Sequence, residues 1–209
     1  MKKNYQLELD KEIESVTSAG KLPSLLLHSC CGPCSSYVLE YLSKYFSVTV
    51  LYFNPNIYPD EEYRHRLSEQ RRIISLLPVQ NRVSIMECGY DHAEFLSASK
   101  GLESEREGGA RCEKCFRLRL ERTAALAKEH GFDYFTTTLS VSPHKNDQML
   151  NLIGEELEKQ YGVRHLPADF KKREGYKRSI ELSKQYGLYR QDYCGCEFSL
   201  RQAREQQGE

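Results

Sequence analysis

Seven of the eight cysteines in this chain of 209 residues fall into three short clusters. Only Cys88 stands outside the clusters, which are Cys30-Cys31-Gly32-Pro33-Cys34, Cys112-Glu113-Lys114-Cys115 and Cys194-Gly195-Cys196. A cysteine that serves packing is usually single and inert, whereas thiolates at these spacings can share a metal or an iron–sulfur cluster, or exchange disulfides. We therefore expect the function to depend on these seven sulfurs, and on a fold that brings them together.

The composition is that of a globular protein with balanced charge. Apolar residues make up 39% of the chain, which is enough for a core, and Lys plus Arg equals Asp plus Glu at 30 each. Because the molecule has no net positive field, any binding of nucleic acid needs a local basic patch.

The sequence predicts a cytoplasmic protein without a membrane partner. Apolar runs such as Leu25-Leu26-Leu27 are far too short to span a bilayer, and the N-terminus is polar, unlike a signal peptide. In a reducing cytosol, clustered cysteines more often bind metal or take part in catalysis than form structural disulfides.

Short apolar or β-branched segments alternate with longer amphipathic ones. Strands are expected at 24–28, 47–53, 83–87, 134–139 and 163–166, and helices at 35–45, 60–77, 91–100, 112–130, 145–161 and 175–186. This alternation predicts an α/β fold, a Rossmann-like (HUP-type) and mostly parallel sheet with helices on both faces. We divide the chain into an N-terminal extension (1–22), partly helical, and a single α/β catalytic domain (23–205).

In such sheets, ligands bind beyond the carboxyl ends of the strands. The first cysteine cluster follows the first predicted strand directly, and Ser140–Lys145 follows the fourth. A metal site is therefore expected at that edge of the sheet.

The first cluster lies where a strand turns into a helix, and the backbone N–H groups and helix dipole there favour thiolates. Cys31 and Cys34 also form a C-x-x-C pair, so a thioredoxin-like redox pair or two buried small side chains are alternatives. Such a pair does not require the adjacent Cys30.

Cys112 and Cys115 project from one face of a helix start. Together with two thiolates of the first cluster they make four, which suits zinc or a 4Fe-4S cluster, and spacing does not separate the two. A structural zinc would have all its coordination positions filled by protein ligands and would take little part in catalysis.

The third cluster has a single residue between its cysteines. A Cys194–Cys196 disulfide would close a strained ring, and strained disulfides are the labile, catalytic ones. Gly195 supplies the backbone freedom that such a ring needs. The same pair could instead hold a second metal ion. Cys88, at a strand end, is expected in the core.

Polar side chains at the ends of predicted strands are candidates for substrate binding: His28, Asn54, Tyr58, Ser140, His144 and Lys145. For His28, a buried and satisfied histidine is the alternative. A basic run near Tyr176 could contact phosphates while the aromatic ring stacks on a base, although such runs are usually just solvated. This run consists of Lys171, Lys172, Arg173, Lys177 and Arg178.

The motifs, taken in order, resemble the QueH family of epoxyqueuosine reductases from about residue 24 to about residue 200. They are Leu26–Cys34, Tyr52–Ile57, Arg111–Leu120, Thr136–Ser140 with Lys145, and Tyr193–Cys196. The combination is specific, although no single motif would be.

The resemblance implies an oxidoreductase that reduces the epoxide of epoxyqueuosine to queuosine at the wobble position of tRNA with a GUN anticodon, the last step of queuosine biosynthesis. It implies that a 4Fe-4S cluster is held by Cys30, Cys31, Cys112 and Cys115. Cys194 and Cys196 then form a redox-active disulfide or bind a second metal ion, iron or zinc. Cys34 could be a further ligand of that metal ion. The basic run becomes a candidate tRNA patch.

The chemistry is compatible with this reading. Removing an epoxide oxygen takes two electrons and two protons, and a 4Fe-4S cluster passes one electron at a time. An external electron donor is required, and a second redox group, or a metal acting as a Lewis acid, would be useful beside the cluster.

Two other classes compete. One is a zinc-stabilised nucleotide-binding module without redox chemistry. The other is an ATP-using tRNA-thiolation enzyme, which needs a phosphate-cradling loop after the first strand. Pro33 removes an N–H donor from that loop and argues against the thiolation enzyme.

Overall fold

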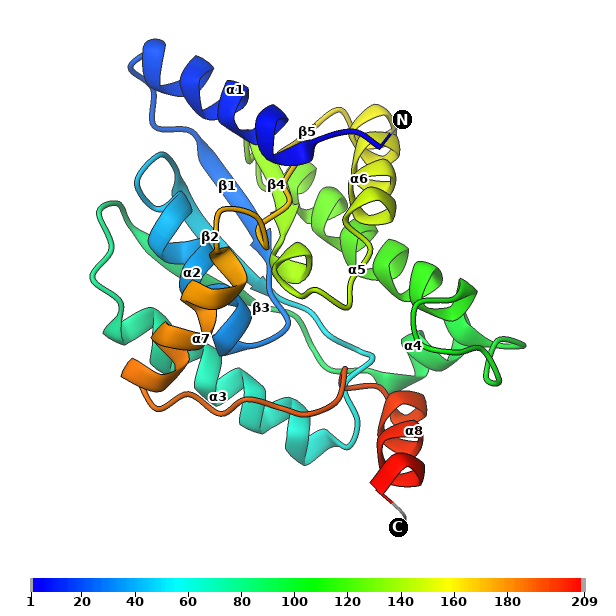
Figure 1. Ribbon diagram of the computed structural model, residues 1–209. Coiled ribbons are helices and arrows are strands. Elements are labelled where there is room, and N and C mark those ends of the chain that lie inside the picture. Colours follow the sequence, from blue (N-terminus) through cyan, green and yellow to red (C-terminus); the bar gives the residue numbers. More distant parts are fainter. Residues whose placement is uncertain (1, 208–209) are drawn as a thin grey trace.

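The computed structural model describes residues 2–207, and a five-stranded parallel sheet lies at its centre (Figure 1). The strands are β1 (Ser24–His28), β2 (Ser47–Tyr52), β3 (Val83–Glu87), β4 (Tyr134–Thr137) and β5 (Arg164–His165), in the order β3-β2-β1-β4-β5. The predicted α/β fold is confirmed. Because the strand order reverses between β1 and β4, these two strands flank the topological switch point, where ligands bind in open sheets.

Helices cover both faces of the sheet. Those that contribute side chains to one face are α1 (Tyr5–Ser18), α2 (Gly32–Leu42) and α3 (Asp60–Leu76), and α7 (Gly175–Gln185) packs against α2. The opposite face is covered by α5 (Ala110–Glu129) and α6 (Asp147–Tyr161). The short helices α4 (His92–Ser99) and α8 (Glu197–Gln207) meet through Phe95 and Phe198 beside the sheet. No helix in the described range is long and apolar enough to cross a membrane.

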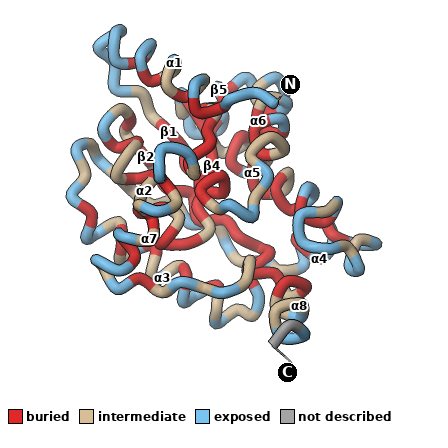
Figure 2. Tube along the Cα trace, in the orientation of Figure 1, coloured by how far each residue is buried: buried red, intermediate tan, exposed pale blue. Residues whose placement is uncertain are grey.

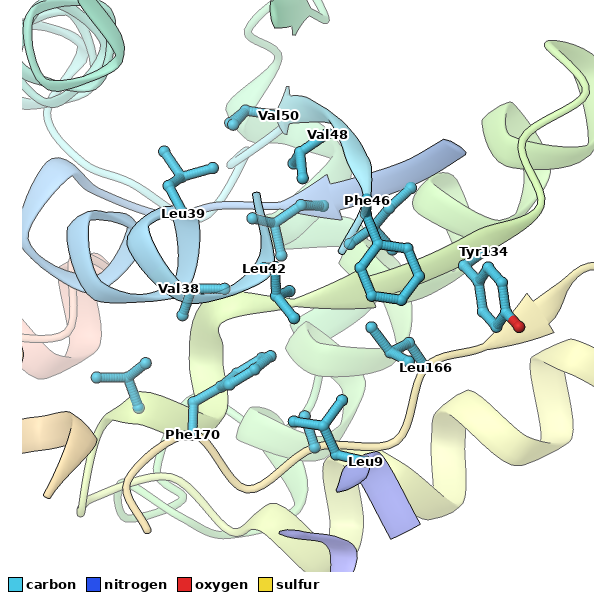
Figure 3. Close-up of a cluster of buried hydrophobic side chains, with 14 of the residues drawn as sticks. Leu9, Val38, Leu39, Leu42, Phe46, Val48, Val50, Tyr134, Leu166 and Phe170 are labelled. Carbon is cyan, nitrogen blue, oxygen red and sulfur yellow. The ribbon is translucent and has the colours of Figure 1, made fainter. Parts of the chain in front are cut away.

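The central strand β1 is buried on both faces, which is why it reads as a continuous apolar run. Leu25 and Leu27 point into the cluster under α1, α2 and α3, part of which is drawn in Figure 3, while Leu26 points to α5 and α6. Figure 2 shows the buried trace concentrated along the strands and the inward sides of the helices. This rigid sheet carries the loops that follow β1 and β4.

Some element boundaries differ from the sequence prediction. The strand expected at 134–139 ends at Thr137, because the Thr137 hydroxyl accepts a hydrogen bond from the Leu139 N–H and starts a 3-10 turn, η1 (Thr138–Val141). Helix α8 was not predicted, and β5 has only two residues. Cys88, expected in the core, is only half-buried at the end of β3.

Helix α1 lies within the segment predicted as an extension, and it contributes to the main core. Leu9, Ile13 and Val16 are buried in the same cluster as Leu25 and Leu27 of β1. The division of the chain at residue 22 stays a prediction.

A Leu9→Ala substitution tests the contribution of α1. Leu9 is fully buried, so we expect its truncation to lower the free energy of unfolding by about 2–5 kcal/mol. Leu7, on the same helix, is 52% exposed, and Leu7→Ala is the matched control, with an expected change within about 0.5 kcal/mol. Urea denaturation measures both. If the two variants were equally stable, α1 would be a dispensable extension.

Candidate metal and substrate site

A cavity of about 570 Å³ opens beyond the carboxyl ends of β1 and β4. Its walls come from the loop after β1, with Cys30 and Cys34, from the segment after β4, and from the C-terminal segment that ends at Cys194. The predicted edge of the sheet is therefore where the structure brings the first and third cysteine clusters together. A cavity of this size suits a small organic ligand.

Three thiols of the first cluster form a group that could hold a metal ion. The sulfurs of Cys30, Cys31 and Cys34 all lie within 4.8 Å of one another, and the Cys30 and Cys31 Sγ atoms are 3.7 Å apart. Their spacing follows from local structure, because α2 begins at Gly32 with Pro33 in its first turn, so the chain bends sharply at the end of β1. The Gln191 side-chain amide also donates a hydrogen bond to Cys31 Sγ, at 3.3 Å.

Hydrogen bonding within this group gives the three thiols different pKa values. It holds the pKa of Cys31 well below its usual range, while it raises the pKa of Cys30 to about 12 and that of Cys34 well above its ordinary value. One thiolate is thus stabilised by two thiols. Because the thiolate is the form that binds metal, the low pKa of Cys31 favours binding of a metal ion by this group.

Cys112 and Cys115 occupy the first turns of α5, and both are buried. The Gly108 N–H donates a hydrogen bond to Cys112 Sγ at 3.2 Å, and burial raises the pKa of Cys115 to about 12. Among the described residues, neither sulfur joins the close group of three. Cys112 shares an apolar cluster with Cys30, and Cys115 packs in a cluster with Cys196.

Gly195 is held in a conformation that only glycine adopts readily. Its φ is +120°, its carbonyl accepts a hydrogen bond from the Tyr58 N–H at 2.8 Å, and an added Cβ would lie 2.8 Å from Arg66 Nη1. The two flanking cysteines are free thiols. Lys145 Nζ donates a hydrogen bond to Cys194 Sγ at 3.0 Å, and the Ser199 N–H donates one to Cys196 Sγ at 3.4 Å.

Arg66, Arg111 and Arg119 are the three largest fully buried side chains, and sequence reasoning missed all of them. Arg66 pairs with Glu62 at 2.6 Å and donates a hydrogen bond to the Cys194 carbonyl at 3.3 Å. Arg119 lines the cavity. Its sequence signal is helical spacing, because it follows Cys115 by four residues on the buried face of α5.

Two of the six predicted substrate residues, His144 and Lys145, line the cavity. His28 is fully buried: its Nδ1 pairs with the Thr137 hydroxyl at 2.9 Å and its Nε2 with the Phe53 carbonyl at 3.2 Å. Burial, with a smaller contribution from Arg119, lowers the pKa of His28 to about 3, so the ring is neutral. The environment of His28 therefore matches the alternative of a buried and satisfied histidine.

The remaining three predicted substrate residues do not line the cavity either. Asn54 donates a hydrogen bond to the Ser29 carbonyl at 2.8 Å and fixes the chain just before Cys30. Ser140 is buried and accepts a hydrogen bond from the Phe170 N–H at 3.3 Å. Tyr58 is 43% exposed and packs beside His92. Asn54 and Ser140 therefore support the walls of the cavity rather than form them.

The predicted basic run is largely paired with acidic side chains. Lys171 bonds Asp147 and Asp169, both at 2.6 Å; the further pairs are Arg173 with Asp10, Lys177 with Glu174, and Arg178 with Glu40 and Glu181. In the part of the chain that the structure describes, only Lys172 of the five has no ion pair. The run is therefore less positive than its sequence suggests, although nearby Tyr176 does line the cavity.

Comparison with known proteins shows which family the chain resembles. The family model described as "Epoxyqueuosine reductase QueH" matches residues 25–202. A protein of that name from Streptococcus pyogenes is 41% identical over 207 residues, 96% of this chain and 81% of that protein. Another from Staphylococcus epidermidis is 42% identical over 205 residues, 94% and 86% of the two chains. A solved structure titled as a predicted tRNA methyltransferase subunit from Methanocaldococcus jannaschii aligns with a TM-score of 0.49 at 13% identity, covering 88% of this chain and 90% of that one.

Proposed function

The chain belongs to the QueH family of epoxyqueuosine reductases, and from this we propose that its cysteine-lined cavity is where the epoxide of epoxyqueuosine is reduced. Membership makes the protein an oxidoreductase of queuosine biosynthesis, which displaces the alternative of a zinc-stabilised module without redox chemistry. The family implies tRNA as substrate. In our proposal, the nucleoside at the wobble position of a GUN anticodon leaves its base stack and enters the cavity.

The buried thiols suit an iron–sulfur cluster, because they supply only sulfur ligands. We propose that Cys30, Cys31, Cys112 and Cys115 would hold a 4Fe-4S cluster. Cys34, Cys194 and Cys196 remain for a second metal ion, iron or zinc. When bound, the cluster supplies single electrons that come from an external donor.

The reaction breaks both C–O bonds of the epoxide, forms a C=C bond, and releases the oxygen as water after uptake of two electrons and two protons. In our proposal, Lys145 orients that oxygen. Its Nζ lies 2.6 Å from the Glu107 carboxylate and 3.0 Å from Cys194 Sγ, and the side chain is 9% exposed. Burial alone would lower the pKa of Lys145, but Cys194 and Glu107 together raise it above its ordinary value. Lys145 Nζ therefore keeps its proton and can donate a hydrogen bond to the substrate.

One observation carries this proposal: a ligand-sized cavity at the switch point is lined by thiols from two cysteine clusters. The test is metal and sulfide analysis of anaerobically purified protein, with a visible spectrum before and after dithionite. We expect about four iron and four sulfide per chain, a brown colour that bleaches, and turnover of epoxyqueuosine-containing tRNA. Zinc without sulfide, persisting after anaerobic reconstitution, would contradict the cluster assignment.

The exposed lysines of the basic run provide a test of tRNA binding. Surface ion pairs contribute only about 0–1 kcal/mol, so phosphates can compete for Lys177 as well as for unpaired Lys172. We expect the double variant Lys172→Glu, Lys177→Glu to bind tRNA about tenfold more weakly, and the slope of log affinity against log salt to fall by roughly two.

A matched control reverses the same number of charges elsewhere. Lys128 and Lys159 are exposed near the carboxyl ends of α5 and α6, which precede β4 and β5 and so lie at the edge of the sheet opposite the cavity. The double variant Lys128→Glu, Lys159→Glu should keep the wild-type salt slope. Equal slopes for both double variants would mean that the tRNA patch lies elsewhere.

A further inference from the structure

Arg119 of α5 is a buried cation without a carboxylate partner in the part of the chain that the structure describes. The side chain is 1% exposed, its Nε donates a hydrogen bond to the Cys115 carbonyl at 3.2 Å, and its Nη2 has no hydrogen-bond partner. Among the described residues, no Asp or Glu lies within ion-pair distance of it, whereas equally buried Arg66 has Glu62. A buried charge without a partner is costly, and an arginine does not escape the cost by losing its proton.

Arg119 lines the cavity together with Cys30, Cys34 and Cys194, and its guanidinium carbon lies 5.7 Å from the centre of the Phe116 ring. Burial tends to lower the pKa of Arg119, and negative charge on Cys115, Cys194, Cys30 or Cys112 raises it, so that the net shift is upward. Three of these four are proposed cluster ligands, and the guanidinium also lines the cavity. The chain has therefore enclosed a fixed positive charge among sulfurs that become anionic when they bind metal.

We propose that Arg119 is a positioning residue for the iron–sulfur cluster, whose charge offsets the negative charge of the cluster and its thiolates and so raises the reduction potential. This inference rests on the proposed function. Reduction adds a negative charge, and a nearby buried cation stabilises the reduced state more than the oxidised one. Net charge and hydrogen bonding around the sulfurs are the terms by which proteins set such potentials.

The positive charge of Arg119 should destabilise the metal-free protein and stabilise the protein that holds the cluster. Without a cluster, Arg119 is a desolvated cation, so an apolar side chain of similar length should leave the melting temperature of the metal-free protein unchanged or raise it. With the cluster bound, the same substitution should lower the reduction potential and speed the loss of iron. A merely structural arginine would instead lower the melting temperature of the metal-free protein and leave the potential unchanged.

The experiment compares Arg119→Met and Arg119→Lys in the reconstituted full-length protein. A mediated dithionite titration followed by electron paramagnetic resonance measures the potential. We expect Arg119→Met to shift the reduction equilibrium at least tenfold toward the oxidised state, which equals 59 mV for one electron. Arg119→Lys keeps the charge and should recover most of the shift. Arg119→Gln, a second neutral variant, serves if Arg119→Met does not fold.

Arg117→Gln is the matched control, because Arg117 lies on the same helix but is 34% exposed and pairs with Glu156. Its potential should equal that of the wild type. A neutral Arg119 variant with the wild-type potential, or an Arg119→Lys variant as low as Arg119→Met, would overturn the inference. Failure of the wild-type protein to bind a cluster would overturn the proposed function instead.

Discussion

A Cys112→Ala variant is expected to lose the iron–sulfur cluster and, with it, all measurable turnover of epoxyqueuosine-containing tRNA. The Cys112 sulfur is buried at the start of α5 and packs in the apolar cluster that Cys30 also contacts. Its removal leaves one iron of a four-iron cluster without a thiolate, and a buried apolar wall offers no replacement ligand. Iron and acid-labile sulfide per chain, with the visible spectrum, measure the loss directly.

Cys88→Ala is the matched control for this loss. The Cys88 thiol is half-buried and packs against the same apolar cluster as Cys112, but it belongs to none of the three cysteine clusters of the sequence. This variant should keep the wild-type content of iron and sulfide.

Cys34→Ala tests whether Cys34 is a cluster ligand in place of Cys112, because Cys34 lies in the close group with Cys30 and Cys31. A Cys34 variant without a cluster, beside a Cys112 variant that keeps it, would show that the proposed ligand set is wrong.

The arrangement of the sheet was predictable because it depends on local pattern. Buried parallel strands read as short apolar runs, and amphipathic stretches between them read as helices, so the strand Ser24–His28 is predicted with its observed bounds. In a parallel sheet the loops after β1 and β4 lie at one edge, whereas the strand order that puts the switch point between these two strands comes from the structure. Helix α8 was missed because it is mostly polar, and among its residues Phe198 packs on Phe95, far away in sequence.

The side-chain environment of the site was less predictable, because it depends on contacts between distant segments. The sequence does not show which acidic residues lie near the basic run, yet Arg178 forms an ion pair with Glu40, and Arg173 forms one with Asp10, both far away in sequence. His28 is the last residue of an apolar strand, and only the structure shows that both of its ring nitrogens are engaged. Arg119 carried a readable signal, since a charge on the apolar face of an amphipathic helix requires a buried partner.

A double variant, Cys194→Ala with Cys196→Ala, is expected to keep the four-iron cluster but to lose turnover by a factor of about 100 or more. Neither cysteine belongs to the proposed cluster ligands, although Cys194 receives a hydrogen bond from Lys145 and Cys196 packs with Cys115. A second redox group or a Lewis-acidic metal at this pair would contribute several kcal/mol to the reaction barrier, and about 1.4 kcal/mol corresponds to tenfold in rate. Retained turnover would rule out both roles.

Single variants then distinguish the two roles of the pair. A disulfide needs both sulfurs, so each single alanine variant should be as inactive as the double variant, and metal analysis should find nothing beyond the cluster. A second metal held with Cys34 should leave partial activity in at least one single variant, with a fifth metal atom per chain in the wild type. Ser199→Ala keeps both thiols and removes only the hydroxyl beside Cys196, so its turnover should stay near that of the wild type. The order of these activities reports whether the third cluster works as a redox pair or as a metal ligand set.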